Sequence, residues 1–132
     1  MGRIPLGVFA TAAATCLATG SAGHTQPITS LANYRFVGTS TPQGSPPWDV
    51  TIDFSNGEAV WSKAADGARA TRLVSGYSLN GERISVNLQA RSPVGIPDLV
   101  CNGTRTDRLV DATCYANAGA PPERLVGRLE RR

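Results

Sequence analysis

Residues 99–116 read LVCNGTRTDRLVDATCYA, with a cysteine near each end and small or polar residues between them. Asp107-Arg108 lies midway and favours a two-residue turn joining two antiparallel strands. Cys101 and Cys114 would then face each other across the strands, with their Cβ atoms near disulfide distance. This stretch therefore predicts a β-hairpin fastened by a structural disulfide, which stabilises a chain by roughly 3 kcal/mol for a loop of this size.

Other uses of these cysteines fit the sequence less well. A zinc clip needs cysteines about two to four residues apart and a second pair of ligands, and the chain offers only one histidine, His24. A redox pair needs Cys-x-x-Cys at the start of a helix, which is absent from the sequence. We therefore expect no metal site and no cofactor.

The first 22 residues have the three parts of a secretory signal peptide. Arg3 supplies the positive charge, the apolar run IPLGVFATAAATCLA follows, and Gly20 and Ala22 suit a cleavage site. The run is shorter than the roughly 20 residues of a spanning helix, and we expect no transmembrane helix after signal removal. We predict a secreted or periplasmic protein with a single domain at residues 23–132. The alternative is lipid attachment at Cys16, as in a bacterial lipoprotein.

Composition excludes some partners. The net charge is +3 and the arginines are spread along the chain, which does not suit a protein that binds nucleic acid. We expect a monomer. Asn102-Gly103-Thr104 is a glycosylation sequon, which matters only in a eukaryotic secretory route.

Turn signals divide the mature chain into strands. Asn56-Gly57, Asp66-Gly67 and Asn80-Gly81 are each flanked by alternating apolar and polar residues, and such dipeptides favour tight hairpin turns. We predict eight strands, at about 33–39, 48–55, 58–64, 68–79, 82–90, 98–106, 109–116 and 123–130.

Facing residues must share one side of the sheet, so the turns predict a register. A two-residue turn at Asn56-Gly57 places Ile52 opposite Trp61, and one at Asn80-Gly81 places Tyr77 opposite Ile84. In both hairpins the apolar residues then share one face.

Asp66-Gly67 does not fit a two-residue turn, because Trp61 would then oppose Arg72 and mix the faces. We predict a three-residue loop, Ala65-Asp66-Gly67, with Gly67 in the left-handed position of a bulge. Trp61 would then face Thr71, and Ala59 would face Leu73.

These strands predict an all-β fold, a small antiparallel up-and-down β-barrel of about eight strands, because a barrel removes both sheet edges. The alternative is a two-sheet β-sandwich. The expected core comprises Tyr34, Phe36, Trp48, Val50, Ile52, Phe54, Ala59, Trp61, Leu73, Tyr77, Ile84, Val86, Leu88, Leu125 and Leu129.

Alternating strand directions place the tight turns at one end and the long, proline-rich connections 40–47, 91–97 and 117–122 at the other. Long, stiff loops are where binding residues usually lie. Our first functional hypothesis is a non-catalytic barrel that binds a small apolar ligand at this end. Its lining would be Tyr34, Trp48, Trp61 and Tyr77.

The alternative is a protein–protein interaction module, such as a hydrolase inhibitor, whose loops bind a secreted or periplasmic protein. The loop residues that we expect to contact such a partner are Pro46, Pro47, Asp66, Arg69, Pro93 and Pro121. A second alternative is an outer-membrane β-barrel, which alternation alone allows.

We do not expect an enzyme. The folded part has no histidine to act as a base, and the chain has no Gly-x-Ser-x-Gly or phosphate-loop motif. The acidic residues read as solvated side chains, with Asp49 and Asp53 on the polar face and Asp98 and Asp107 in loops.

Overall fold

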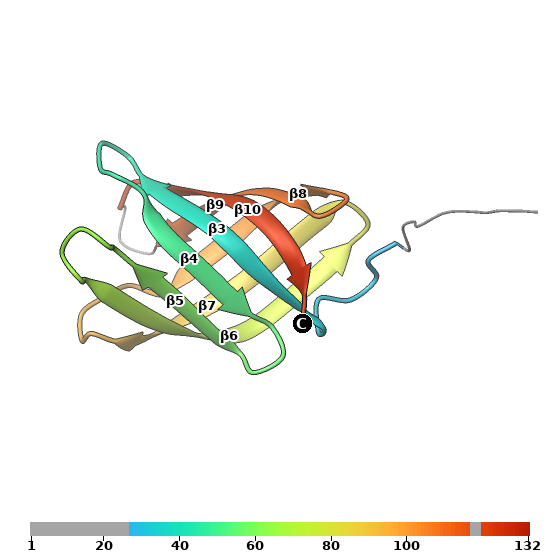
Figure 1. Cartoon of the computed structure of the whole chain (residues 1–132), viewed down its shortest axis with the longest axis horizontal. Coiled ribbons are helices and arrows are strands. Elements are labelled where there is room, and N and C mark those ends of the chain that lie inside the picture. Colours follow the sequence, from blue (N-terminus) through green and yellow to red (C-terminus); the bar gives the residue numbers. More distant parts are fainter. Residues whose placement is uncertain (1–26, 117–119) are drawn as a thin grey trace, which may run out of the picture.

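The computed structural model describes residues 27–116 and 120–132, whose regular structure is entirely β-strand. The strands follow one another along the chain (Figure 1): β3 (Tyr34–Pro42), β4 (Trp48–Asp53), β5 (Glu58–Ser62), β6 (Arg69–Asn80), β7 (Arg83–Ser92), β8 (Leu99–Thr106), β9 (Leu109–Ala116) and β10 (Glu123–Arg131). The sequence predicted all eight of these strands, with bounds that differ by a few residues. The expected signal peptide, residues 1–22, lies outside the described residues, as do Cys16 and His24.

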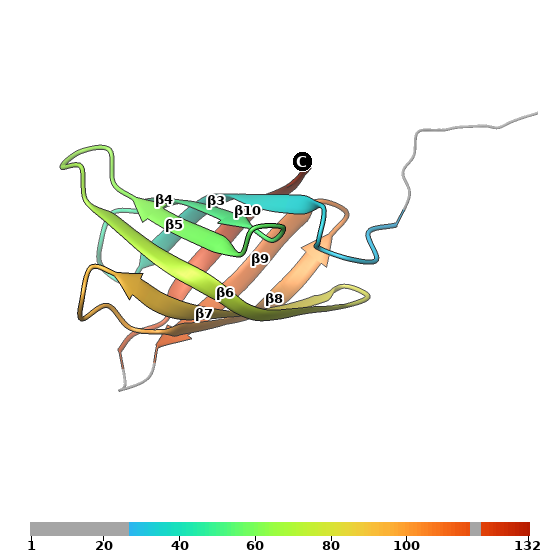
Figure 2. The same cartoon turned by 90° about the horizontal axis from the view of Figure 1, so that it is seen from below.

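The strands close into one barrel in chain order, because β10 pairs with β3 as well as with β9. Figure 2 shows the strands tilted around a common axis, with the interior between them. Closure pairs every strand on both sides and so leaves no edge open. The predicted up-and-down barrel is confirmed, and the alternative of a two-sheet sandwich is wrong.

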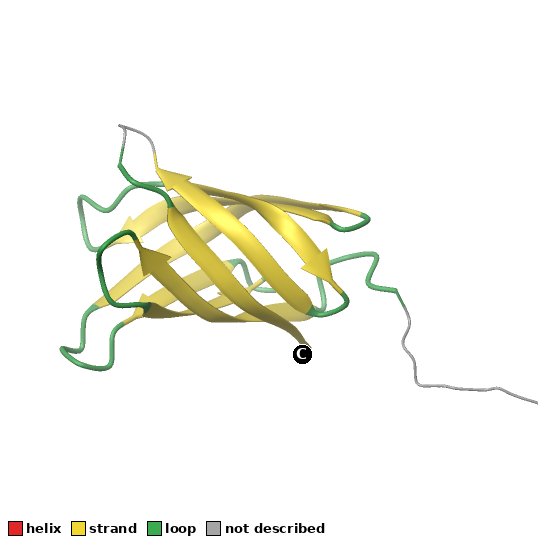
Figure 3. Cartoon of the chain, turned by 90° about the horizontal axis from the view of Figure 1, so that it is seen from above, coloured by secondary structure: helices red, strands yellow, loops and turns green. Residues whose placement is uncertain are grey.

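The connections alternate between the two ends of the barrel (Figure 3). One end, the tight-turn end, carries the short connections 54–57, 81–82 and 107–108. The other, the long-loop end, carries loops 43–47, 63–68 and 93–98 and residues 120–122. The predicted separation of short and long connections is therefore confirmed for the connections that the structure describes; of the predicted loop 117–122, residues 117–119 lie outside the described residues.

The hairpin at Asp107-Arg108 has the predicted register. Cys101 pairs with Cys114, both side chains are buried inside the barrel, and their sulfurs form a disulfide. Asp107 adopts a positive φ of 57°, as the first position of a tight hairpin turn requires.

Two other hairpins keep the predicted faces with shifted partners. Ile52 opposes Ala59 and not Trp61, because the turn takes four residues, 54–57, whose start is capped by Asp53 Oδ1 accepting from the Ser55 and Asn56 amides. Tyr77 opposes Val86 and not Ile84, because the turn lies one residue later, at 81–82. Each change moves the pairing by two residues, which returns every side chain to the same face.

The predicted register between β5 and β6 is wrong. Trp61 faces Ala70 and Ala59 faces Arg72, so the pairing is one residue away from the prediction. A slip of one residue exchanges the two faces, and Arg72 therefore points into the barrel while Leu73 is half-buried on the outside. Irregular pairing between Val74 and Gly76 then returns Tyr77 to the inner face.

Most of the expected core is buried, with three exceptions. Trp48 is half-buried, Leu73 lies on the outer face, and Tyr77 keeps 41% of its surface exposed at the tight-turn end. Residues that the sequence did not assign to the core are buried as well: Ile28, Leu31, Ala70, Leu99, Cys101, Val110, Ala112 and Cys114.

The segment before β3 closes the tight-turn end of the barrel. Leu31 has no exposed surface and Ile28 is buried with it in the core. The segment is tied to the barrel by polar contacts, since Arg105 Nη2 donates to the Ile28 carbonyl at 2.9 Å and the Arg132 amide donates to the Asn33 carbonyl at 3.0 Å. We call residues 27–33 the plug.

A glycine pair joins the first and last strands. Gly38 of β3 lies opposite Gly127 of β10, and the tip of the Phe36 ring covers both. A Cβ on Gly38 would overlap the Val126 carbonyl oxygen, and one on Gly127 would overlap the Val37 carbonyl oxygen. Glycine is therefore required here for the two strands to approach closely and close the barrel.

Candidate functional site

The aromatic residues expected to line one cup lie at opposite ends of the barrel. Tyr34 begins β3 and Tyr77 lies near the end of β6, both at the tight-turn end, where Tyr77 packs edge-on against Phe54 with ring centroids 5.2 Å apart. Trp48 begins β4 and Trp61 lies near the end of β5, both at the long-loop end. The four side chains therefore do not surround one cavity.

The barrel interior is filled by its own side chains. The internal cavity has a volume of about 10 Å³ and is lined by apolar residues, among them Phe36, Ile52 and Val86. That volume is comparable to a single water molecule. Pockets for small organic ligands are far larger, about 300–1,000 Å³.

The residues expected to contact a partner protein do lie together at the long-loop end. Pro46 and Pro47 are exposed in loop 43–47, and Pro93 and Pro121 are exposed near the other loops. Asp66 shapes loop 63–68, because its carboxylate accepts from the Ala68 amide at 3.0 Å. Figure 1 shows the three described loops, 43–47, 63–68 and 93–98, at the same end of the barrel. Arg69 follows at the start of β6 and is also exposed.

Loop 93–98 is held at its base by the barrel. Asp98 Oδ1 accepts from the Ala90 amide at 2.7 Å, which joins the end of the loop to β7. Arg72 Nε donates to the Pro97 carbonyl at 3.0 Å from inside the barrel. Ile96 is half-buried and packs against the core. The base of the loop is thus fixed by two hydrogen bonds, one from the Ala90 amide and one from the buried Arg72 side chain, and by the packing of Ile96.

The tip of the same loop is a fully exposed valine. Val94 and Gly95 form the centre of a turn in which the Ile96 amide donates to the Pro93 carbonyl at 3.5 Å, and Gly95 has a φ of 97°. A positive φ at the third turn position favours glycine. The Val94 side chain projects wholly into solvent, so an apolar group is presented on a fixed support.

Arg72 is the main charge inside the long-loop end. Only 5% of its surface is exposed, and its guanidinium carbon lies 4.7 Å from the centroid of the Trp61 ring. Desolvation lowers the pKa of Arg72, although the carboxylates of Glu123 and Asp98 act in the opposite sense. Stacking on the indole and bonding to a carbonyl offset part of the cost of burying this cation.

A second polar contact lies at the same end, between β3 and β10. The hydroxyl of Ser40, which has no exposed surface, donates to Glu123 Oε1 at 2.6 Å. Lys63 lies at the rim, with its ammonium 5.1 Å from the centroid of the half-buried Trp48 ring. The long-loop end is therefore closed by polar and aromatic groups together.

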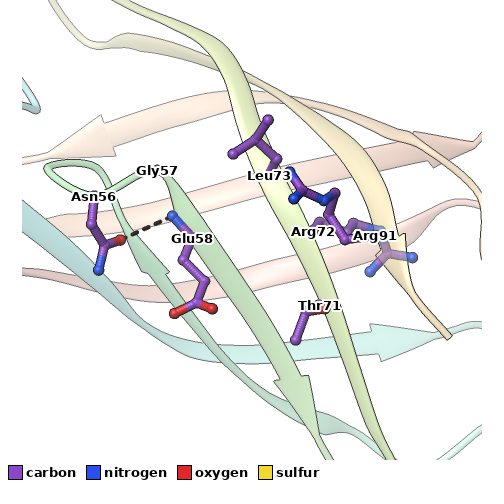
Figure 4. Close-up of a pocket in the computed structure, with 7 residues that line it drawn as sticks. All are labelled: Asn56, Gly57, Glu58, Thr71, Arg72, Leu73 and Arg91. Carbon is purple, nitrogen blue, oxygen red and sulfur yellow. Dashed lines mark hydrogen bonds between the residues drawn. The ribbon is translucent and has the colours of Figure 1, made fainter.

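The outer surface of the barrel carries several open hollows. One of about 530 Å³ lies between loop 43–47 and β10, lined by Pro42, Pro46 and Val126 among others. Another, of about 380 Å³, lies over β5, β6 and β7 (Figure 4). In that hollow β6 runs between Glu58 and Arg91. Asn56 Oδ1 accepts a hydrogen bond from the Glu58 amide at 3.0 Å.

Within residues 27–116 and 120–132, no group of three or more His, Cys, Asp or Glu residues is placed to hold a metal ion. In that part of the chain no helix has the length and apolar character needed to cross a membrane. Comparisons with protein-family models, with curated proteins and with solved structures find no match to this chain.

The sequence missed the groups that shape the site. The predicted register, with Leu73 facing the core, places Arg72 on the outer face, and Ser40 and Glu123 belong to no motif. Val94 stands between Pro93 and Gly95, and Pro and Gly this close together in a long loop indicate a turn, which is the signal that could have found it.

Proposed function

We propose that this protein is a non-catalytic binding module that contacts a secreted or periplasmic partner protein through its long-loop end. Loop 93–98 is central to the proposed contact. The observation that carries the proposal is Val94, a fully exposed apolar side chain on a loop clamped by Arg72 and Asp98. A loop that is already ordered loses little conformational entropy on binding.

The form of the tip favours a particular mode of contact. Val94 and Gly95 occupy a turn, so the tip cannot lie extended as a substrate strand does in a protease cleft. It would act as a knob that enters an apolar pocket of the partner. Interface energy is commonly concentrated in a few such buried anchors.

The filled interior favours this loop-mediated function over the binding of a small apolar ligand inside the barrel. A ligand of ordinary size would have to displace core residues such as Phe36 and Ile52 from a cavity of about 10 Å³. The disulfide between Cys101 and Cys114 is compatible with an extracellular or periplasmic location.

Site-specific photo-cross-linking tests the proposal. A benzophenone amino acid replaces Asp66 in loop 63–68, next to the clamped loop, and the protein is irradiated in the cells that produce it. We expect discrete protein adducts whose yield falls by about tenfold with Val94→Asp, because a carboxylate resists burial in an apolar pocket.

The matched control places the benzophenone at Thr39, on the outer face of β3. Val100→Asp serves as a second control, since Val100 is an exposed valine on the barrel wall. Equal adducts from positions 66 and 39, or adducts that persist with Val94→Asp, would contradict the proposal.

A further inference from the structure

The outer wall formed by β6, β7 and β8 has a chemistry unlike that of the loops. Two hollows of about 460 and 410 Å³ lie on it. Uncharged amide and hydroxyl residues make up most of the lining of the first hollow. In the second, Ser75, Asn87 and Gln89 alternate with apolar residues such as Val100. We call this surface the amide wall and define it by Asn80 of β6, Ser85, Asn87 and Gln89 of β7, and Asn102 and Thr104 of β8.

The two hollows are neighbours along β7. Ser85 pairs with Asn102 in the first, and Asn87 pairs with Val100 in the second, so they occupy successive outward positions of one strand pair. The lining of β7 runs from Arg83 to Gln89, a length of about 20 Å at the rise of an antiparallel strand. The site is therefore elongated.

The amide groups of the wall are available for a ligand. Within the described part of the chain, the side chains of Asn80, Asn87, Gln89 and Asn102 have no hydrogen-bond partner; Asn87 accepts only through its backbone carbonyl, from Ser75 Oγ at 3.2 Å. Each amide offers two donors and an acceptor. Gly76 lies opposite Asn87 and leaves its amide uncovered.

Charge separates this wall from the opposite one. The outer faces of β3 and β10 carry ion pairs, Arg35 with Glu130 at 3.6 Å and Arg128 with Glu130 at 2.7 Å. The pair of Asp111 with Arg124 marks the border of the amide wall, because Asp111 lies opposite Thr104. In the hollows of the amide wall, the charged residues are Arg83 and Asp98, which lie toward the two far ends. Between them the surface is neutral and rich in donors and acceptors, with the exposed ring of Tyr115 beside Val100.

We propose that the amide wall binds a linear, neutral polysaccharide along β7. Hydroxyl groups of such a chain match paired amide donors and acceptors, and a neutral polymer needs no countercharge. The length of the surface favours an extended chain over a compact ligand. The six residues that define the wall lie outside the loops of the long-loop end, and the proposal stands or falls independently of the proposed partner contact.

Titration by NMR tests the site. The ¹⁵N-labelled protein is mixed with hexamers of five neutral sugars: cellohexaose, chitohexaose, xylohexaose, mannohexaose and laminarihexaose. We expect at least one to shift amide signals of residues 80–89 and 99–104, with weaker binding of the matching dimer. Asn87→Ala combined with Asn102→Ala should weaken that binding by about tenfold or more, because bonds to two amides are lost.

The double variant should fold as the wild type does, because the side chains of Asn87 and Asn102 are exposed. A loss of binding then reports on the site and not on the fold. Gly76→Val provides a second block, because a Cβ there would lie 3.5 Å from Asn87 Nδ2, an ordinary contact that partly covers the amide. Thr39→Ala, on the opposite wall, is the control and should bind as the wild type does. The proposal is overturned if no hexamer shifts the wall, if the double variant binds unchanged, or if the wall proves to be a dimer contact that saccharide does not disturb.

Discussion

The two ends of the barrel are closed by different chemistry. At the tight-turn end the plug inserts Leu31 and Ile28 into the core, and both side chains are apolar and buried. At the long-loop end Arg72 stacks on Trp61 and bonds to a loop carbonyl. One end is sealed by hydrophobic burial, and the other by a cation with a few directed contacts.

This difference assigns separate roles to the two ends. Apolar burial is non-directional and contributes mainly to stability. A buried cation contributes little net stability, because desolvation offsets its interactions, but its hydrogen bond fixes the position of Pro97. The tight-turn end therefore stabilises the fold, whereas the long-loop end orients a loop. Substitutions at the two ends should separate these roles.

The largest effect is expected at the plug. Leu31→Ala removes a side chain with no exposed surface and leaves a cavity, which should lower the free energy of unfolding by about 3 kcal/mol. Urea denaturation followed by tryptophan fluorescence measures the change. A loss below about 1 kcal/mol would mean that the plug is not part of the cooperative core.

A smaller, pH-dependent effect is expected from Asp53 at the same end. Burial tends to raise the pKa of Asp53, but hydrogen bonds from Ser55 and Asn56 and the charge of Arg132 outweigh it and lower the pKa below its usual value. Because the pKa of Asp53 is lower in the folded state, its carboxylate stabilises the fold at pH values above the unfolded-state pKa of about 3.9. This stabilisation is lost as the pH falls through the folded-state pKa.

Asp53→Asn should therefore cost about 1 kcal/mol at neutral pH, with a difference from wild type that shrinks in acid. Denaturation at a series of pH values measures it. A difference that stays constant down to pH values below about 3 would show that the Asp53 charge is not involved.

At the long-loop end, Arg72→Met should change the free energy of unfolding by less than about 1 kcal/mol, because a lost hydrogen bond is offset by removing a buried charge. Loop 93–98 loses its clamp, however. Hydrogen exchange should become faster at the amides of Ile96 and Ala90, which bond within or next to this loop. Unchanged exchange at both amides would remove Arg72 from the role of positioning the loop.

The smallest stability effect is expected at the loop tip. Val94→Asp alters a fully exposed side chain and should leave the free energy of unfolding within about 0.5 kcal/mol of wild type. Thermal unfolding measures this, and the same protein serves in the cross-linking experiment. A large destabilisation would show that Val94 supports the barrel itself.

The sequence predicted the strands and the disulfide because both depend on local signals. Alternating apolar and polar residues predicted which side chains of β4 and β7 face the core. Asp107-Arg108 predicted a two-residue turn, which brings Cys101 opposite Cys114. At the turns near Asn56 and Asn80, the observed pairing differs from the predicted pairing by two residues. The alternation of apolar and polar residues cannot reveal such a shift, because a shift of two residues keeps each side chain on the same face.

The candidate site was harder to predict, because it depends on contacts between distant segments. The predicted register of β6 is wrong because it places Arg72 in solvent, whereas the Trp61 ring and the Pro97 carbonyl give Arg72 partners inside the barrel. The plug was missed because Ile28 and Leu31 are isolated apolar residues in a short segment without alternation. The inward position of Arg72 and the burial of the plug both depend on contacts that form only when the barrel closes.

The glycine pair Gly38 and Gly127 has a consequence for how the chain folds. It joins strands from opposite ends of the chain, and contacts between distant segments form slowly because of the entropy lost in closing the loop. During synthesis, the edge of β3 that pairs with β10 stays unpaired until β10 has left the ribosome. A chain that ends at Ala116 should therefore aggregate through its open edges, which light scattering would detect.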